Sequence, residues 1–191
     1  MRCMSCQCFS LSTFCKNCKT NLLAPSVTKR TIGTLDVYSF YKYSNIENLL
    51  LTKHTPRGYR IFKALANITL KPFIKKFIAA DPREIHIIGI DEKVKNGYSH
   101  VSLLAHSMKS KGVKVLHSSL MAQNRVSYAG KTLQYRIENP RNFIYKGTSS
   151  VDAILVDDII TTGITLQEAQ NVLLSHGVNV LFALTLADAK E

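Results

Sequence analysis

The stretch AILVDDIITTGITL, from Ala153 to Leu166, decides the fold because it joins a buried strand to a loop and a helix. Four apolar residues run into two adjacent carboxylates, Asp157 and Asp158, and the strand is predicted to end at Asp157. A loop of threonines and one glycine follows, and the next segment has the apolar spacing of a helix. Strand–loop–helix units of this kind are typical of parallel α/β sheets.

The loop after the carboxylates has the composition of an anion site. Gly163 lets the backbone approach a ligand closely, and Thr161, Thr162 and Thr165 add hydroxyl donors. Backbone N–H groups in such a turn, together with a helix N-terminus, attract phosphate. The carboxylates repel phosphate and accept hydrogen bonds from hydroxyls instead. The combination predicts a phosphorylated ribose, with Mg²⁺ nearby, at the carboxyl end of a strand.

Hydrophobic periodicity predicts the remaining elements. From residue 84 onward the order is strand, helix, strand, loop, strand, helix, strand, which indicates an α/β fold with a mostly parallel sheet flanked by helices. Residues 33–43 are predicted to form a strand or hairpin, and residues 57–79 an amphipathic helix that Pro72 kinks or splits. Residues 121–150 are polar and are predicted to form a long loop with little regular structure.

Composition divides the chain into three parts, which fits one domain with a small appendage. Residues 1–23 hold all the cysteines, and residues 24–80 are basic and partly helical after a linker-like opening at 23–29. Residues 81–191 carry the predicted α/β core. We expect residues 24–80 to form a hood over the ligand site of this core.

The five cysteines lie within the first 18 residues and form two Cys-x2-Cys knuckles, Cys3 with Cys6 and Cys15 with Cys18. Four thiolates at this spacing close around one tetrahedral Zn²⁺, and they leave no open position, so the predicted zinc is structural. An iron–sulfur cluster is the alternative. Cys8 is predicted to be a spare, unliganded thiol.

Positive charge is concentrated in the first part of the chain. The net charge is +12, of which residues 1–80 carry +11 and residues 81–191 carry +1. Such a region recruits polyanions, although a solvated surface is the alternative. No apolar run is long enough for a transmembrane helix, and the N-terminus lacks the pattern of a secretory signal. We therefore expect a cytoplasmic protein without membrane insertion.

Aromatic and basic side chains alternate within this basic part. Aromatic faces suit bases and cations suit the backbone of a single strand, so the pattern favours single-stranded nucleic acid. The alternative is that most of these aromatics belong to the core. The residues concerned are Tyr38, Phe40, Tyr41, Tyr43 and Tyr59, with Lys42, Lys53, Arg57 and Arg60.

The segment ILVDDIITTGIT resembles the phosphoribosyl-pyrophosphate (PRPP) signature of type I phosphoribosyltransferases. The resemblance implies that Asp157 and Asp158 bind the ribose hydroxyls at the catalytic centre and that the loop of Thr161, Thr162, Gly163 and Thr165 binds the 5′-phosphate. It also implies that Mg²⁺ accompanies PRPP. A fold of the type I phosphoribosyltransferase kind with a small N-terminal zinc-finger element is therefore expected.

The whole arrangement, a four-cysteine element followed by this domain, resembles the ComF (competence protein F) family. Further similar pieces are LLLTKHTPRG, through Lys53; KNGYSHVSLLA, through Gly97, Tyr98, Leu104 and Ala105; and LQYRIENPRNF, through Arg136, Asn139 and Phe143. The chain departs from that family at Asn96, where Arg is usual, and at His100, where Gln is usual. The strand IHIIGIDEK also lacks the usual pair of prolines.

The family plan implies two more parts of a PRPP site. The turn after the first core strand contacts pyrophosphate and here contains Asp91 and Lys93. The long loop 121–142 forms a lid that carries Arg125, Lys131 and Arg136. An ordinary surface loop is the alternative in both cases.

The resemblance implies a role in natural transformation, with PRPP and single-stranded DNA as ligands and DNA-uptake or recombination proteins as partners. Two other functions stay open. One is a metabolic phosphoribosyltransferase that transfers ribose 5-phosphate to a small base, since no residue specifies an acceptor. The other is a non-catalytic PRPP sensor. The sequence also leaves open whether the protein is an enzyme at all.

Overall fold

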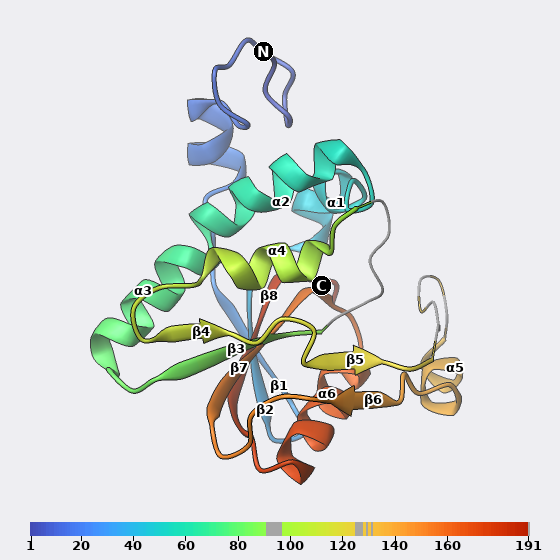
Figure 1. The fold of residues 1–191 in the computed structure, drawn as a ribbon. Helices are drawn as coiled ribbons and strands as arrows, with labels where there is room; N and C mark the ends of the chain where they lie inside the picture. Colours follow the sequence, from blue (N-terminus) through green and yellow to red (C-terminus); the bar gives the residue numbers. More distant parts are fainter. Residues whose placement is uncertain (91–96, 125–127, 129, 131, 191) are drawn as a thin grey trace.

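The computed structural model describes residues 1–90, 97–124, 128, 130 and 132–190. At its centre is a six-stranded sheet in the order β1-β2-β8-β7-β3-β4 (Figure 1). β1 pairs antiparallel with β2, and the other four neighbouring pairs are parallel. The strands are β1 (Thr28–Ile32), β2 (Leu35–Lys42), β3 (Ile85–Gly89), β4 (Val113–Val115), β7 (Asp152–Ile160) and β8 (Asn179–Asp188).

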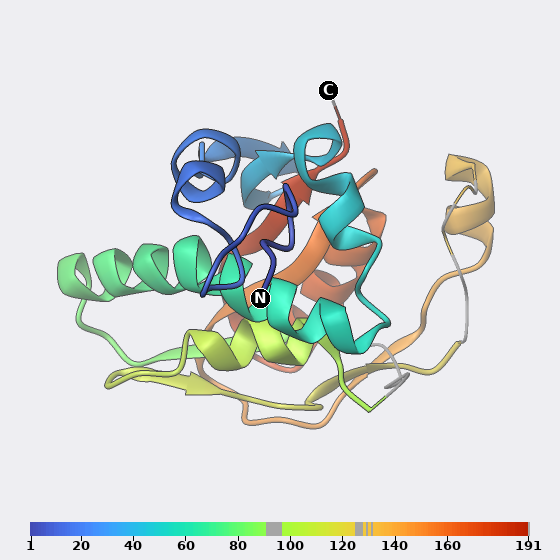
Figure 2. The same ribbon diagram turned by 90° about the horizontal axis from the view of Figure 1, so that it is seen from above.

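Helices cover both faces of this sheet, as Figures 1 and 2 show. One face packs against α1 (Tyr43–Leu50), α2 (Pro56–Ile68), α3 (Leu70–Ala80) and α4 (His100–Ser107), and the other against α6 (Ile164–Ser175). The predicted α/β fold class, with a mostly parallel sheet flanked by helices, is therefore confirmed. Residues 24–80 contribute β1 and β2 to the same sheet as the strands of residues 81–191.

The helical segment around Pro72 is divided as the sequence predicts. α2 ends at Ile68 and α3 begins at Leu70, so the break lies at Thr69, and Pro72 falls in the first turn of α3, where a missing N–H costs little. Thr69 Oγ1 donates to the Leu65 carbonyl (2.8 Å) at the end of α2. The break lets two short helices follow the curved face of the sheet.

Two loop predictions are wrong. Residues 121–150 contain β5 (Leu120–Ala122), α5 (Leu133–Glu138) and β6 (Phe143–Tyr145), and β5 pairs antiparallel with β6. Strands of three residues are too short to show a period in the sequence. The linker predicted at 23–29 runs into β1, because an exposed edge strand has the polar composition of a linker.

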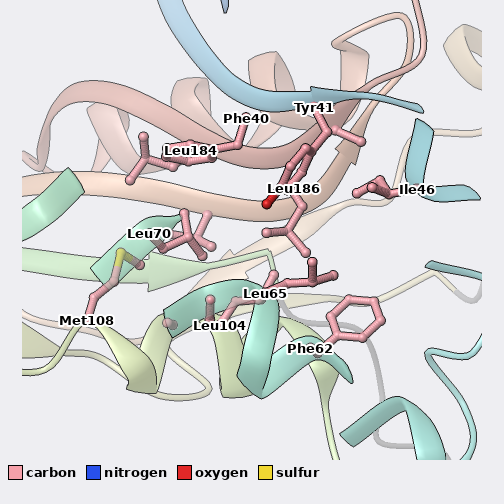
Figure 3. Packing of buried hydrophobic residues seen from close by; sticks show 14 of the residues in the cluster. Phe40, Tyr41, Ile46, Phe62, Leu65, Leu70, Leu104, Met108, Leu184 and Leu186 are labelled. Atoms are coloured by element: carbon pink, nitrogen blue, oxygen red, sulfur yellow. The ribbon is translucent and has the colours of Figure 1, made fainter. Parts of the chain in front are cut away.

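Two apolar layers lie on the two faces of the sheet. Figure 3 shows Phe40, Leu184 and Leu186 from the sheet meeting Leu65 of α2 and Leu104 of α4. Side chains alternate between the faces along β7: Ile154 and Val156 join this layer, whereas Ala153 and Leu155 join the layer under α6. β7 is thus buried on both faces, which explains its continuous apolar run.

We expect Leu65→Ala to lower the free energy of unfolding by about 2–5 kcal/mol, because Leu65 is fully buried and its loss leaves a cavity between α2 and the sheet. Urea unfolding at pH 7 measures this. Leu51→Ala is the matched control, since Leu51 is 67% exposed and its loss should cost less than about 0.5 kcal/mol. Equal losses in the two variants would contradict this packing.

Candidate ligand site and metal centre

The acidic pair lies near the carboxyl end of β7, in the centre of the sheet. The strand continues to Ile160, so the prediction that it ends at Asp157 is wrong, and both carboxylates belong to the strand. The peptide N–H of Asp158 donates to Asp157 Oδ1 (2.8 Å). Asp157 is half-buried, whereas Asp158 is only 6% exposed. The two acids are therefore neighbours in sequence with different surroundings.

Asp158 sits in a small buried group of charged and polar side chains. Its Oδ2 atom lies 3.0 Å from Lys53 Nζ and 3.2 Å from His100 Nε2. Lys53 comes from the turn between α1 and α2, and His100 is the first residue of α4. The His100 ring in turn packs edge-on against Phe62 and His54. Lys53 also belongs to a segment on which the resemblance rests.

The surroundings of Asp158 keep it ionised. Burial alone would raise the pKa of its carboxyl group, but the hydrogen bond from His100 and the charge of Lys53 outweigh burial and hold the pKa well below its usual range. A buried carboxylate of this kind needs such partners, because its desolvation is otherwise too costly.

The predicted phosphate loop connects β7 to α6. Thr161 and Thr162 are exposed, and Gly163 stands at the N-cap of α6 with φ +87°. A Cβ atom at Gly163 would lie 2.8 Å from Ile32 Cγ1, so both the backbone conformation and the close packing on β1 require glycine. The loop therefore points the first N–H groups of α6 toward the edge of the sheet where Asp157 and Asp158 lie.

Two arginines from distant parts of the chain converge on Thr161. Arg30 of β1 donates through one terminal nitrogen to the Thr161 carbonyl and through the other to Asp188 Oδ1 (2.8 Å). Arg136 of α5 donates to Thr161 Oγ1. Sequence analysis singled out Arg136 but missed Arg30, because no local pattern shows that the register of an edge hairpin carries it to this loop. The loop is thereby surrounded by positive charge.

The described part of the predicted lid is held by Tyr128. The Arg136 and Arg141 guanidinium groups lie 5.5 and 4.8 Å from the centre of the Tyr128 ring. The Tyr128 hydroxyl donates to the Asn139 carbonyl (2.7 Å), and Glu168 of α6 accepts from the backbone N–H groups of Arg141 and Asn142. The segment is thus tied to α6 beside the phosphate loop.

The remaining predicted contacts lie outside the described residues. These are Asp91 and Lys93 of the pyrophosphate turn and Arg125 and Lys131 of the lid. The structure brings together the acidic pair, the threonine loop and Arg136.

The four cysteines of the two knuckles form a compact group. The Sγ atoms of Cys3, Cys6, Cys15 and Cys18 all lie within 4.8 Å of one another, and Cys6 Sγ is 3.7 Å from Cys15 Sγ. Sulfurs of a tetrahedral zinc site, with Zn–S of about 2.3 Å, lie about 3.8 Å apart, so this group fits zinc. Cys8 stands outside the group, 3.3 Å from Cys6 Sγ.

Local hydrogen bonds prepare Cys3 for metal binding. Burial raises the pKa of its thiol, but backbone hydrogen bonds, first from Cys15, outweigh burial and lower the pKa to about 6. The Cys15 N–H lies 3.3 Å from Cys3 Sγ. A thiolate at neutral pH is the form that binds a metal.

The cysteine element is fastened to the rest of the protein at α2 and β2. Arg57 donates to the Met4 carbonyl (3.1 Å), and Tyr41 donates to the Leu23 carbonyl (2.9 Å). Phe14 and Leu23 are buried in the same layer as α2. Figure 1 shows the element standing beyond α2, on the side away from the sheet.

Most of the aromatics singled out in the basic part belong to the core. Phe40 and Tyr41 are buried, and Tyr38 packs against Phe73 and Phe182. Tyr59 of α2 differs, since it is 41% exposed and has Lys63 Nζ 6.0 Å from its ring centre. Within the described residues, no helix has the length and apolar character needed to cross a membrane.

No protein-family model and no curated protein matches this sequence. Solved structures similar to this chain include an adenine phosphoribosyltransferase, which is 14% identical, with 90% of this chain and 89% of that chain covered and a TM-score of 0.47. Adenine phosphoribosyltransferase from Saccharomyces cerevisiae is 16% identical, with 89% and 86% covered and a TM-score of 0.46. Orotate phosphoribosyltransferase from Aeropyrum pernix is 16% identical, with 92% and 81% covered and a TM-score of 0.41. We transfer no residue role from these proteins to this chain.

We expect the purified protein to hold about one zinc ion per chain, which Cys6→Ser removes because a tetrahedral thiolate site tolerates no missing ligand. Metal analysis after dialysis and the thermal midpoint measure this. Cys8→Ser is the matched control and should keep its zinc, because Cys8 lies outside the group of four sulfurs. Loss of zinc from Cys8→Ser together with its retention in Cys6→Ser would show that the ligand set is different.

Proposed function

We propose that this protein binds PRPP at the carboxyl end of its parallel sheet. The observation that carries the proposal is the acidic pair of β7 followed directly by a threonine–glycine loop that opens α6. A loop of this geometry binds a phosphate group, and carboxylates beside it bind sugar hydroxyls. Asp157 and Asp158 then form the sugar end of the site, and Thr161, Thr162, Gly163 and Thr165 form its 5′-phosphate end.

The surrounding charges support an anionic ligand. Arg30 and Arg136 already contact Thr161, so a phosphate on the loop lies beside two guanidinium groups. Asp91 and Lys93, for the pyrophosphate end, and Arg125 and Lys131, for the lid, complete the proposed site. The acidic pair and the phosphates of PRPP together provide the oxygen ligands that Mg²⁺ prefers.

This site suits the chemistry of phosphoribosyl transfer. In that reaction the bond from ribose C1′ to pyrophosphate breaks while a nucleophile attacks C1′, and positive charge develops on the ring. Carboxylates that hold the ring hydroxyls stabilise this charge, and a closed lid excludes water. Mg²⁺ bound with PRPP neutralises the leaving pyrophosphate. No described residue assigns the nucleophile, so PRPP binding is the primary proposal and transfer the secondary one.

We further propose that the protein acts in the cytoplasm during natural transformation, as a ComF-like protein that binds single-stranded DNA. The charge of +11 over residues 1–80 supports this, because it provides a non-specific attraction to a phosphate backbone. On α2, the exposed side chains of Tyr59, Arg60 and Lys63 combine a ring with cations. Partners among DNA-uptake or recombination proteins follow from the same role.

Calorimetric titration with Mg²⁺–PRPP tests the ligand. We expect the parent to bind and Asp157→Asn to lose about 1.5–3 kcal/mol of binding, roughly a ten- to hundredfold loss of affinity, because a charged hydrogen bond to the sugar disappears. Glu84→Gln is the control, since it removes a carboxylate just before β3, at the opposite end of the sheet. A parent that does not bind PRPP, or equal losses in both variants, would overturn the proposal.

Binding of fluorescent single-stranded DNA tests the surface of α2. We expect Lys63→Glu to weaken binding, and two neutralised phosphates alone make affinity fall about sevenfold between about 50 and about 200 mM salt. Lys111→Glu is the matched control, because it makes the same charge change on an exposed residue just before β4. Affinity that does not depend on salt, or equal effects of the two substitutions, would count against DNA binding by α2.

A further inference from the structure

We propose that the two acids of the pair have different roles: Asp157 binds the sugar, and Asp158 is a positioning residue that anchors Lys53 and His100. The inference deepens the proposed PRPP site and rests on it. The sequence alone treats two adjacent carboxylates as equivalent, and the surroundings in the structure separate them.

The first observation is the direction of the side chains. Neighbouring residues of a strand point to opposite faces, and β7 follows this rule up to Val156. The contacts of Asp158 with Lys53 and His100 place its carboxylate on the face covered by α2 and α4. Extending the same alternation directs Asp157 toward the other face, on which α6 and the phosphate loop lie. The two carboxylates therefore approach a ligand from different sides.

The second observation is how the Asp158 carboxylate is used. A single atom, Oδ2, has both Lys53 Nζ and His100 Nε2 within 3.2 Å. The side chain is 9% exposed, and that of His100 is 5% exposed, so this contact is nearly closed to solvent. A sugar hydroxyl that used the same oxygen would have to displace an ammonium group, at a large electrostatic cost.

The third observation is what Asp158 holds in place. Lys53 begins the chain's path into α2, and His100 begins α4, so one carboxylate joins two helical segments to the end of β7. Lys53 is 29% exposed, which leaves part of its ammonium group at the surface of the site. Without Asp158, this positive charge loses its nearest carboxylate and competes with the ligand for Asp157. Asp158 thus controls the charge presented to the sugar without contacting it.

A double variant separates positioning from direct contact. We expect Asp158→Asn alone to lower the thermal midpoint and to weaken Mg²⁺–PRPP binding about tenfold, the effect of one charged interaction. Lys53→Gln/Asp158→Asn removes both charges of the pair, while the amide oxygen introduced by the second substitution still accepts from His100. This double variant should recover most of the lost affinity and most of the lost stability. Calorimetry and thermal unfolding on the full chain measure both.

The possible outcomes divide cleanly. A folded double variant that binds PRPP no better than Asp158→Asn overturns the inference, because it shows that the carboxylate itself contacts the ligand. Parent-like affinity of Asp158→Asn, or of Asp157→Asn, overturns it as well. If the parent fails to bind PRPP, the proposed function falls first. Rescue in the double variant, together with loss in Asp157→Asn, establishes the two roles.

The pH dependence of stability gives a second readout. Groups that face Asp158 are Lys53 and His54 from the turn after α1, Tyr43 from α1, His100 from α4 and its neighbour Asp157. Because the pKa of Asp158 is depressed in the folded state, its contribution is complete above about pH 4 and is lost as the pH falls below that value. The thermal midpoints of the parent and Asp158→Asn should therefore converge on acidification to about pH 3. A constant difference would show that Asp158 is not held as a carboxylate.

Discussion

The pairing of β7 with β3 on one side and β8 on the other is the constraint on which the rest of the structure depends. Residues Ala153 to Val156 are fully buried, so the strand can exist only between two neighbours and two layers of side chains. Parallel neighbours require crossover connections, and these supply α4 and α6. The strand then emerges into solvent at its carboxyl end, where a loop and a helix N-terminus are exposed together. The chemistry of the site is a consequence of how this one strand is buried.

Local spacing explains what could be predicted from the sequence. The four cysteines, the acidic pair and the threonine–glycine loop each lie within a short segment, so their mutual geometry follows from a turn or a strand end. The division of the helix near Pro72 is local in the same sense. The structure adds contacts that cross the whole chain, and these determine how the local motifs behave.

Long-range contacts explain what sequence reasoning missed. Lys53 and Asp158 are 105 residues apart, and Arg30 and Thr161 are 131 residues apart. No periodicity records such pairs, because they depend on the order of strands in the sheet and on the length of an edge hairpin. The three-residue strands β5 and β6 were missed for a different reason, since their pairing with each other, and not their own pattern, stabilises them. The burial of Phe40 and Tyr41 likewise follows from β2 entering the sheet.

The position of β2 has a consequence for how the polypeptide can be divided. β2 covers one side of β8, a ten-residue strand that is buried along nearly all its length. A fragment starting near residue 81 would keep the acidic pair and the threonine loop, but it would expose that long apolar strand as an unpaired edge. Such edges recruit other chains and aggregate. The basic N-terminal part therefore also acts as a cap on the sheet, so that a fusion or truncation at this boundary would trade a binding surface for insolubility.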